Sequence, residues 1–140
     1  MFVRELFEAD ALPVLERVLA FTEARHAVLA ANVANAETPS WRRQDLPVAE
    51  FRRELERAID RRDATPGRFV MRPVSLEPAG DRHSGSSEAG ILRHDDNSVD
   101  LDREMALLAR NGLFHNTVAT LAREKYRSML AAIEGRNGSA

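Results

Sequence analysis

The feature that most constrains the fold is a pair of long amphipathic segments, one toward each end of the chain. In residues 10–35 and again in residues 100–134, apolar side chains recur at alternating intervals of three and four. This spacing places them along one side of an α-helix, as in a coiled coil. The seam of the first segment consists of Leu12, Leu15, Leu19, Thr22, His26, Leu29, Val33 and Ala36. The seam of the second consists of Leu101, Met105, Leu108, Gly112, His115, Ala119, Ala122, Tyr126, Met129 and Ile133.

Local signals define the ends of both predicted helices. Pro13 is tolerated only in a first turn, so the first helix should begin near residue 10 or 11. Asn35 can take the left-handed conformation that ends a helix, and Pro39 pushes the residue before it out of the helical region. Asp100 suits the N-cap of the second helix, and Gly135 suits its end.

The middle of the chain has weaker signals. Apolar residues at helical spacing predict a short helix over residues 47–61. Residues 69–76 are predicted to be extended or to form a weak hairpin, and the Gly- and Ser-rich residues 80–90 to form a flexible loop. We therefore predict an all-α protein with a coiled-coil-like bundle of two terminal helices and a mostly irregular, mobile middle. Its parts are a helical arm over residues 1–40, a variable middle over residues 41–98 and a helical arm over residues 99–140.

Both apolar stripes are wider than a single partner helix requires. Further apolar residues beside the two seams are Val14, Val18, Phe21, Val28, Leu107, Phe114, Val118 and Leu121. Burying one Leu or Val side chain stabilises a protein by ~1.5–3 kcal/mol, so a seam of six to eight holds about 10–20 kcal/mol. The two helices can cover each other, but such a pair still presents apolar surface. The pattern is typical of a chain that completes its folding in an assembly.

Composition argues against several classes of function. The chain has no cysteine, which removes disulfides and Cys-ligated zinc. Its net charge of −2, from 20 basic and 22 acidic residues, favours neither nucleic acid nor an anionic membrane. Acidic residues are interleaved with the arginine pairs, which we interpret as solvated, salt-bridged surface. These pairs are Arg42 with Arg43, Arg52 with Arg53 and Arg61 with Arg62.

The residues that could carry chemistry do not form a catalytic, cofactor or metal site. The histidines lack the spacing of metal ligands. We interpret His83 and His94 as solvated loop residues, and His26 and His115 as side chains that pack at the seam edge. No nucleophile elbow or phosphate-binding glycine loop is present, so the sequence predicts a protein that is not an enzyme.

No secretion signal or membrane span is predicted. The first ten residues carry four charges and lack the apolar run of a Sec-type signal. The longest run without a charged residue or histidine, residues 27–36, is far short of the ~20 residues that a transmembrane helix needs.

The segment from Leu29 to Trp41 reads L-A-A-N-V-A-N-A-E-T-P-S-W. Taken alone, it is a capped helix end followed by a turn. It resembles the N-terminal signature of the flagellar axial proteins, the rod, hook and filament-junction components, whose pattern is roughly L-A-x-N-I-A-N-x-x-T-P-G-Y. Two positions depart from the pattern, because Ser40 replaces the usual Gly and Trp41 the usual Tyr. Glycine adopts a positive φ readily and serine does not, so the replacement puts a positive φ at Ser40 in doubt.

The second half of the chain narrows the resemblance to the rod proteins. Residues 97–105 read N-S-V-D-L-D-R-E-M and are followed by L-A-R-N-G-L at residues 108–113 and A-A-I-E-G at residues 131–135. These phrases and the short length are similar to the flagellar basal-body rod family, and most of all to its proximal-rod members. The resemblance covers residues 10–61 and 95–136.

This resemblance implies a structural subunit of the proximal rod of the bacterial flagellum, located in the periplasm. Such proteins leave the cell through the flagellar type III apparatus without a cleaved signal. Their terminal helices pack side by side into a hollow shaft that passes later subunits and transmits torque. The implied partners are copies of itself, other rod proteins, membrane-ring and rod-adaptor proteins and the export apparatus, without nucleic acid, small-molecule substrate, cofactor or membrane insertion. Another proximal-rod component and a stand-alone coiled-coil adaptor remain alternatives.

The seams and the motif together predict an assembly interface. Asn32 and Asn35 are expected to find hydrogen-bond partners at the helix end, and small residues are expected to let helices approach closely. The predicted interface residues are Leu12, Leu15, Leu19, Leu29, Asn32, Val33, Asn35, Thr38, Pro39, Trp41, Leu101, Met105, Leu108, Gly112, Ala119, Ala122, Tyr126, Met129 and Ile133.

Overall fold

The computed structural model describes residues 11–64, 69–80 and 99–137. In these ranges the chain forms three helices and one pair of very short strands. The elements are α2 (Leu12–Ala34), β1 (Gln44–Asp45), α3 (Val48–Ala64), β2 (Ala79–Gly80) and α4 (Leu101–Asn137). The prediction of an all-α protein with two long helices and a short one is confirmed.

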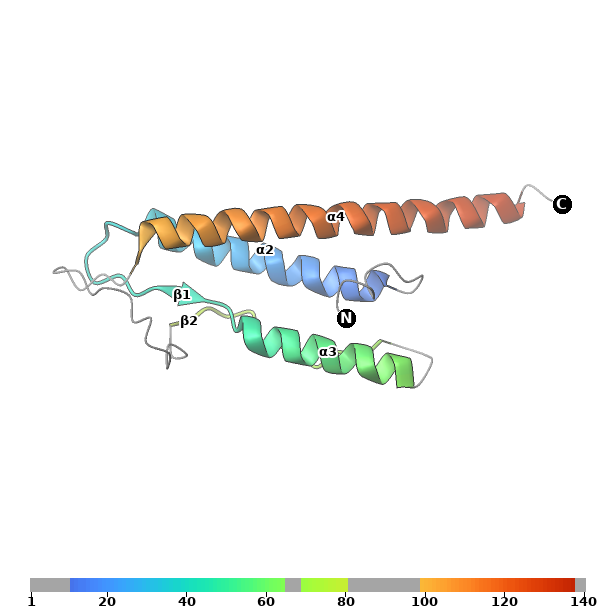
Figure 1. The fold of residues 1–140 in the computed structure, drawn as a ribbon, viewed down its shortest axis with the longest axis horizontal. Coiled ribbons are helices and arrows are strands. Elements are labelled where there is room, and N and C mark those ends of the chain that lie inside the picture. The colour runs from blue at the N-terminus through green and yellow to red at the C-terminus, as the bar shows by residue number, and fades with distance from the viewer. Residues whose placement is uncertain (1–10, 65–68, 81–98, 138–140) are drawn as a thin grey trace.

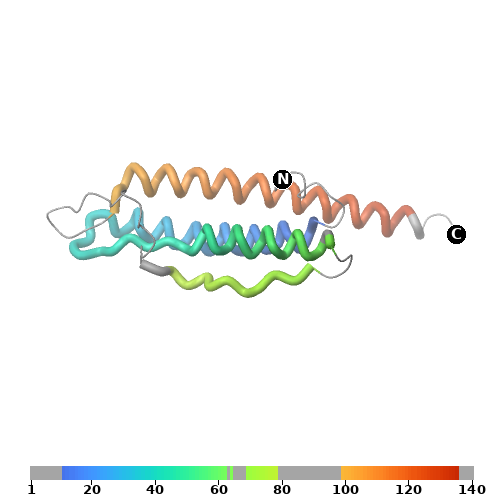
Figure 2. The backbone as a smooth tube through the Cα atoms, turned by 60° about the horizontal axis from the view of Figure 1, so that its bottom comes forward, coloured from blue at the N-terminus to red at the C-terminus, as the bar shows by residue number. Residues whose placement is uncertain are grey.

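The helices lie lengthwise beside one another (Figure 1). α2 and α4 pack side by side and run in opposite directions, and α3 runs antiparallel to α2. α4 has 37 residues, about 55 Å at 1.5 Å per residue, and extends past the first turn of α2. Figure 2 shows the extended residues 69–78 running along α3.

One apolar core joins the three helices. Phe21 of α2 stacks on Phe51 of α3, with ring centroids 4.0 Å apart. Leu15 and Val18 of α2 and Val118 of α4 belong to the same cluster. The remaining buried members are Ala11, Val14, Val28, Leu46, Leu55, Ile59 and Ala122.

The extended segment is held by side chains rather than by strand pairing. Phe69, Met71 and Val74 pack against the core. β2 pairs antiparallel with the distant β1, with Gln44 opposite Gly80. Of the two predicted alternatives for residues 69–76, the extended one is therefore correct and a local hairpin is not formed. The predicted loop over residues 80–90 lies outside the described residues, apart from Gly80 in β2.

The end of α2 differs from the prediction. Pro13 lies in the first turn as expected. Asn35, however, has φ −105° and ψ 15°, so the predicted left-handed cap is wrong. Its backbone N–H donates to the carbonyl oxygens of Ala31 and Asn32 instead, and this satisfies the helix end without a left-handed residue. The positive φ of the turn is kept at Ser40, with φ 60°, although glycine is absent there.

The other helix ends are partly as predicted. Asp100 caps α4, because its Oδ1 accepts a hydrogen bond of 3.3 Å from the backbone N–H of Arg103. Gly135 does not end α4, which continues to Asn137. A single glycine costs a helix only ~1 kcal/mol, and it stops a helix when it takes a left-handed conformation, which Gly135 does not. α3 continues to Ala64, three residues beyond the predicted end. None of the helices among the described residues combines the length and apolar character needed to cross a membrane.

Candidate functional site

Asn32, in the motif near the end of α2, is fully buried and joins three parts of the chain. Its Nδ2 donates to the backbone oxygen of Gln44 at 2.6 Å and to Oε2 of Glu104 at 2.9 Å. Its Oδ1 accepts from the backbone N–H of Gln44 at 3.1 Å and from Nε1 of Trp41 at 3.5 Å. One amide side chain therefore ties α2 to α4 and to the segment that leads into β1.

Two acidic and two basic side chains extend this contact into a network. Glu104, with no exposed area, accepts a hydrogen bond from Nε of Arg43. Nη2 of Arg43 also lies 3.1 Å from Oδ2 of Asp45. Asp45 in turn accepts two hydrogen bonds of 2.8 Å from Arg25 of α2. The four charges cancel, and a buried carboxylate such as that of Glu104 is tolerated only when it is paired in this way. We call Arg25, Asn32, Arg43, Asp45 and Glu104 the polar network.

The charges of the network shift two of its pKa values. Burial alone would raise the pKa of Asp45, but the hydrogen bonds and charge of Arg25, the N–H of Leu46 and the charge of Arg43 outweigh it and hold this pKa below its usual value. Burial alone would lower the pKa of Arg43, but the hydrogen bond and charge of Glu104, with the charge of Asp45, raise it above its usual value. Both groups are therefore charged at neutral pH.

The lowered pKa of Asp45 predicts a loss of stability in acid. A carboxyl whose pKa is lower in the folded chain contributes stability that is fully present above its unfolded pKa of about 3.9 and disappears as pH falls through the folded pKa. We expect Asp45→Asn to be less stable than the parent chain at pH 7, and this difference to shrink steadily below about pH 4. Urea unfolding across this range measures it. A difference that stayed constant down to pH 2 would contradict the role given to Asp45.

The second half of the motif shapes the turn after α2. Nδ2 of Asn35 donates to the oxygen of Ala31 at 2.8 Å, and Oγ1 of Thr38 donates to Oδ1 of Asn35 at 3.1 Å. The backbone N–H of Trp41 then donates to the oxygen of Thr38 at 3.3 Å. Pro39 is exposed at this turn. Both Asn32 and Asn35 thus have hydrogen-bond partners at the helix end, as the sequence predicts.

Polar contacts also fix how α2 and α4 are aligned. Nδ2 of the buried Asn111 donates to the backbone oxygen of Thr22 at 2.8 Å. Oγ1 of Thr22 lies 2.8 Å from Nδ1 of His115. The hydroxyl of Tyr126 donates to Glu16 near the start of α2. His115 is therefore a packed residue with a hydrogen bond, as interpreted from the sequence, whereas His26 is exposed.

The side of α4 that contacts α2 is not centred on the predicted apolar seam. Its buried residues are Glu104, Asn111, Val118 and Ala122. Five residues of the predicted seam are at least half-buried and five large ones stay exposed; the former are Leu108, Gly112, His115, Ala119 and Ala122. The exposed ones are Leu101 (38%), Met105 (54%), Tyr126 (42%), Met129 (44%) and Ile133 (52%). Of the predicted residues of α2, Leu15 and Leu29 are buried, and Leu12, Leu19 and Val33 are half-buried.

Sequence reasoning missed most of the polar network. Arg43 was expected to be solvated, and this is wrong, because its side chain is only 14% exposed and pairs with Glu104 and Asp45. Arg62 is likewise buried, whereas Arg52, Arg53 and Arg61 are exposed as expected. A signal was available in the second helix, where Glu104, Asn111 and Val118 are seven residues apart and so share one side. A search for the most apolar row of residues on the helix passes over a row that contains Glu104 and Asn111.

The C-terminal part of α4 presents apolar side chains beyond the start of α2. Because Tyr126 contacts Glu16 and α2 begins at Leu12, residues from about 130 onward lack a facing turn of α2. Met129, Leu130 and Ile133 are 44–55% exposed here. No group of three or more potential metal ligands occurs among the described residues. Within the described ranges, the arrangement is that of a helix pair with a fixed alignment and an exposed apolar side, which is suited to binding other helices.

Comparisons with known proteins agree with this character. No family model matches the chain. The chain is similar to the flagellar basal body rod protein FlgB of Escherichia coli, with 29% identity over 134 residues that cover 91% of this chain and 95% of the relative. It is similar to FlgB of Salmonella typhimurium, with 27% identity over 134 residues, 91% of this chain and 95% of the relative. FlgB of Borrelia hermsii is 28% identical over 144 residues, 92% of this chain and 98% of the relative. The resemblance predicted from the two motifs is confirmed, and the chain is FlgB-like along nearly its whole length.

Proposed function

We propose that this chain is a structural subunit of the proximal rod of the bacterial flagellar basal body. The observation that carries the proposal is its similarity to FlgB rod proteins of three distinct bacteria over about nine-tenths of its length. The fold supports the proposal, because long helices with an uncovered apolar side can pack side by side in a shaft.

Polymerisation in this proposal uses the two long helices. The polar network and the contacts of Thr22 hold α2 and α4 in one alignment, and the exposed apolar residues of α4 meet neighbouring subunits. Met129 and Ile133 are central to this surface, because Met129 lies where α4 begins to extend past α2 and Ile133 lies beyond that point. Each large apolar side chain that a neighbour covers contributes ~1.5–3 kcal/mol when fully buried. The predicted interface residues thus divide into those that build the subunit and those that join subunits.

The wider setting belongs to the same proposal. The subunit would be exported by the flagellar type III apparatus without a cleaved signal and would lie in the periplasmic part of a hollow, torque-transmitting rod. Its partners would be copies of itself, other rod proteins, and the membrane-ring and rod-adaptor proteins. A structural role needs neither a cofactor nor a catalytic step.

Deletion and complementation in the bacterium of origin test the proposed function. A strain without this chain is expected to be non-motile, with basal bodies that lack a rod in electron micrographs, and the restored gene should return both. An epitope-tagged chain should co-purify with basal bodies. Motile deletion cells with complete rods would contradict the proposal. A tagged chain found only in a fixed soluble oligomer would favour a coiled-coil adaptor instead.

A further inference from the structure

α4 carries a second regular pattern beside the face that packs on α2. This pattern starts at Leu101, and its six residues are spaced four, seven, seven, seven and four positions apart. Because an α-helix turns by ~100° per residue, these positions lie within roughly 60° of one another around the helix. We call this set the α4 flank; it consists of Leu101, Met105, Gly112, Ala119, Tyr126 and Leu130.

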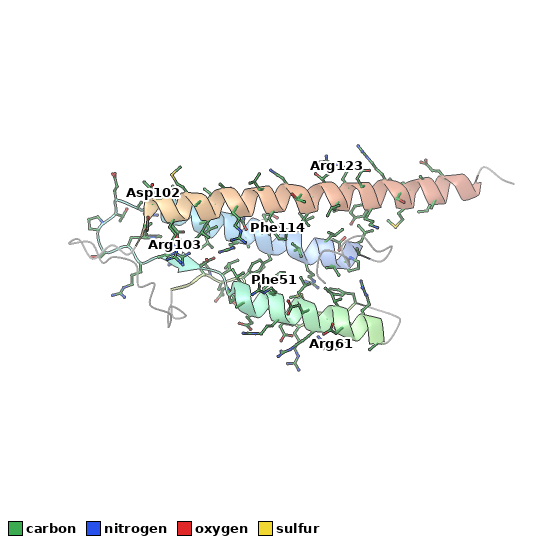
Figure 3. All side chains as sticks on the ribbon, in the orientation of Figure 1. Phe51, Arg61, Asp102, Arg103, Phe114 and Arg123 are labelled. Atoms are coloured by element: carbon green, nitrogen blue, oxygen red, sulfur yellow. The ribbon has the colours of Figure 1, made fainter. Side chains whose placement is uncertain are left out.

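The large residues at both ends of the α4 flank are exposed, and its two small central residues, Gly112 and Ala119, are half-buried. Leu101, Met105 and Leu130 are 38%, 54% and 55% exposed. A Cβ atom added to Gly112 would meet no other atom within 4 Å. Glycine weakens a helix interior relative to alanine, and the open space beside Gly112 leaves room for another helix to approach closely. Arg123, which lies on the same side, points away from α2 in Figure 3, and its long stem can turn outward to keep its charge in water.

The flank reads the same from either end: two large residues, two small ones and two large ones. If two copies align in opposite directions, Gly112 of one copy faces Ala119 of the other, and Leu101 faces Leu130. Straight helices that cross are closest at the centre of the contact and diverge toward its ends. Small residues at the centre and large ones at the ends therefore match the shape of such a pair.

Charges beside the flank favour the antiparallel direction. Asp102 lies near the start of α4 and Arg127 near its end, and both are exposed. An antiparallel pair brings the Asp of each copy toward the Arg of the other, whereas a parallel pair brings like charges together. Arg127 also contacts Glu124 at 3.0 Å, but both side chains are at least 60% exposed, and such surface pairs contribute little.

We infer that two copies of this chain pair through the α4 flank, antiparallel, around a two-fold axis between Gly112 and Ala119. A two-fold pair is closed and cannot propagate. It is therefore a form of the free subunit, separate from any rod, and it keeps the apolar flank out of water until the copies part. The inference rests on α4 alone and does not depend on the proposed function.

Single cysteines test the contact, because the chain has none of its own. Asn116 is exposed and lies close to the two-fold axis, whereas the exposed Thr117 lies ~100° further round the helix. Under mild oxidation, Asn116→Cys is expected to form a disulfide-linked dimer and Thr117→Cys to remain largely monomeric. Equal linkage of the two variants would overturn the proposed face.

A mixture of two variants tests the direction. Asp102→Cys and Arg127→Cys, each carrying a different tag, are expected to link to each other across an antiparallel pair. Linkage of Asp102→Cys to itself in preference to the mixed product would show a parallel pair and overturn the inference.

Two glycines of α4 give a matched measurement of affinity. A Cβ atom at Gly135 also meets nothing within 4 Å, but Gly135 lies outside the flank. Sedimentation of the parent chain over about a hundredfold range of concentration should show a monomer and a dimer in exchange. Gly112→Leu should weaken the dimer at least about tenfold and Gly135→Leu should not, while both keep their helix content. A parent chain that stays monomeric throughout, or equal effects of the two variants, would overturn the pair. Rod assembly is scored separately in cells, so failure of the pair and failure of the proposed function are distinguishable.

Discussion

Replacing Glu104 with alanine is expected to lower the free energy of unfolding by about 3–5 kcal/mol. The carboxylate has no exposed area, and it accepts hydrogen bonds from Arg43 and from Asn32. Its removal takes the acceptor from Nε of Arg43 and one of the two acceptors from Nδ2 of Asn32. Leaving such buried donors unsatisfied costs more than the pair itself contributes. Urea unfolding followed by circular dichroism measures the change.

A second glutamate on the same helix provides the control. Glu124 is 60% exposed and pairs with Arg127, so Glu124→Ala should change the free energy of unfolding by less than about 1 kcal/mol. Apolar replacement of both partners, Glu104→Leu with Arg43→Met, should recover much of the loss, because no buried charge is then left unpaired. Equal effects of Glu104→Ala and Glu124→Ala would show that the polar network does not anchor the fold.

Replacing Met129 with aspartate is expected to abolish motility and leave the isolated subunit folded. Met129 is 44% exposed at the point where α4 begins to extend past α2, so its side chain supports little of the subunit's own core. In the proposed rod, a neighbour covers this position, and a carboxylate buried there without a partner would oppose assembly by several kcal/mol. Swimming in soft agar and electron microscopy of basal bodies measure the outcome.

The adjacent residue gives a control with the same added charge. Ser128 is exposed and lies ~100° round the helix from Met129, so Ser128→Asp should remain motile. Both variants should unfold within about 0.5 kcal/mol of each other, because both introduce an exposed aspartate near the end of the same helix. Normal motility of Met129→Asp would remove this surface from the proposed interface. Leu19 is a less informative site, because it packs against the core and its loss would disturb the fold as well.

Local physics explains why so much of the fold is predictable. Pro13, Asp100 and the apolar intervals of α2, α3 and α4 act within one or two turns of their own helix, so the neighbouring residues suffice to predict them. The predictions that failed concern helix ends, where the last backbone groups can be satisfied in more than one way. Asn35 satisfies the end of α2 without a left-handed conformation, and Gly135 is carried through α4 because one glycine costs little.

The candidate site was predictable only in part, because its contacts join residues that lie far apart in the sequence. The motif around Asn32 and Asn35 was identified, and both amides find partners as expected. Their partners could not be named, because Glu104 is 72 residues from Asn32 along the chain. Arg43 was misjudged, because a charge pattern does not reveal which arginine will meet a buried carboxylate.

The sequence alone determined that this chain is built from two long amphipathic helices and a motif-bearing turn, since helical periodicity and capping are local properties of the chain. It also showed that the helices carry more apolar surface than one pair can bury. Only the tertiary structure decided which side of α4 packs against α2 within the same chain. The side that packs on α2 includes the polar Glu104, Asn111 and His115, because hydrogen bonds to α2 and to Arg43 satisfy those groups. Five of the ten predicted seam residues are thereby left exposed, and this choice depends on contacts between residues far apart in the sequence.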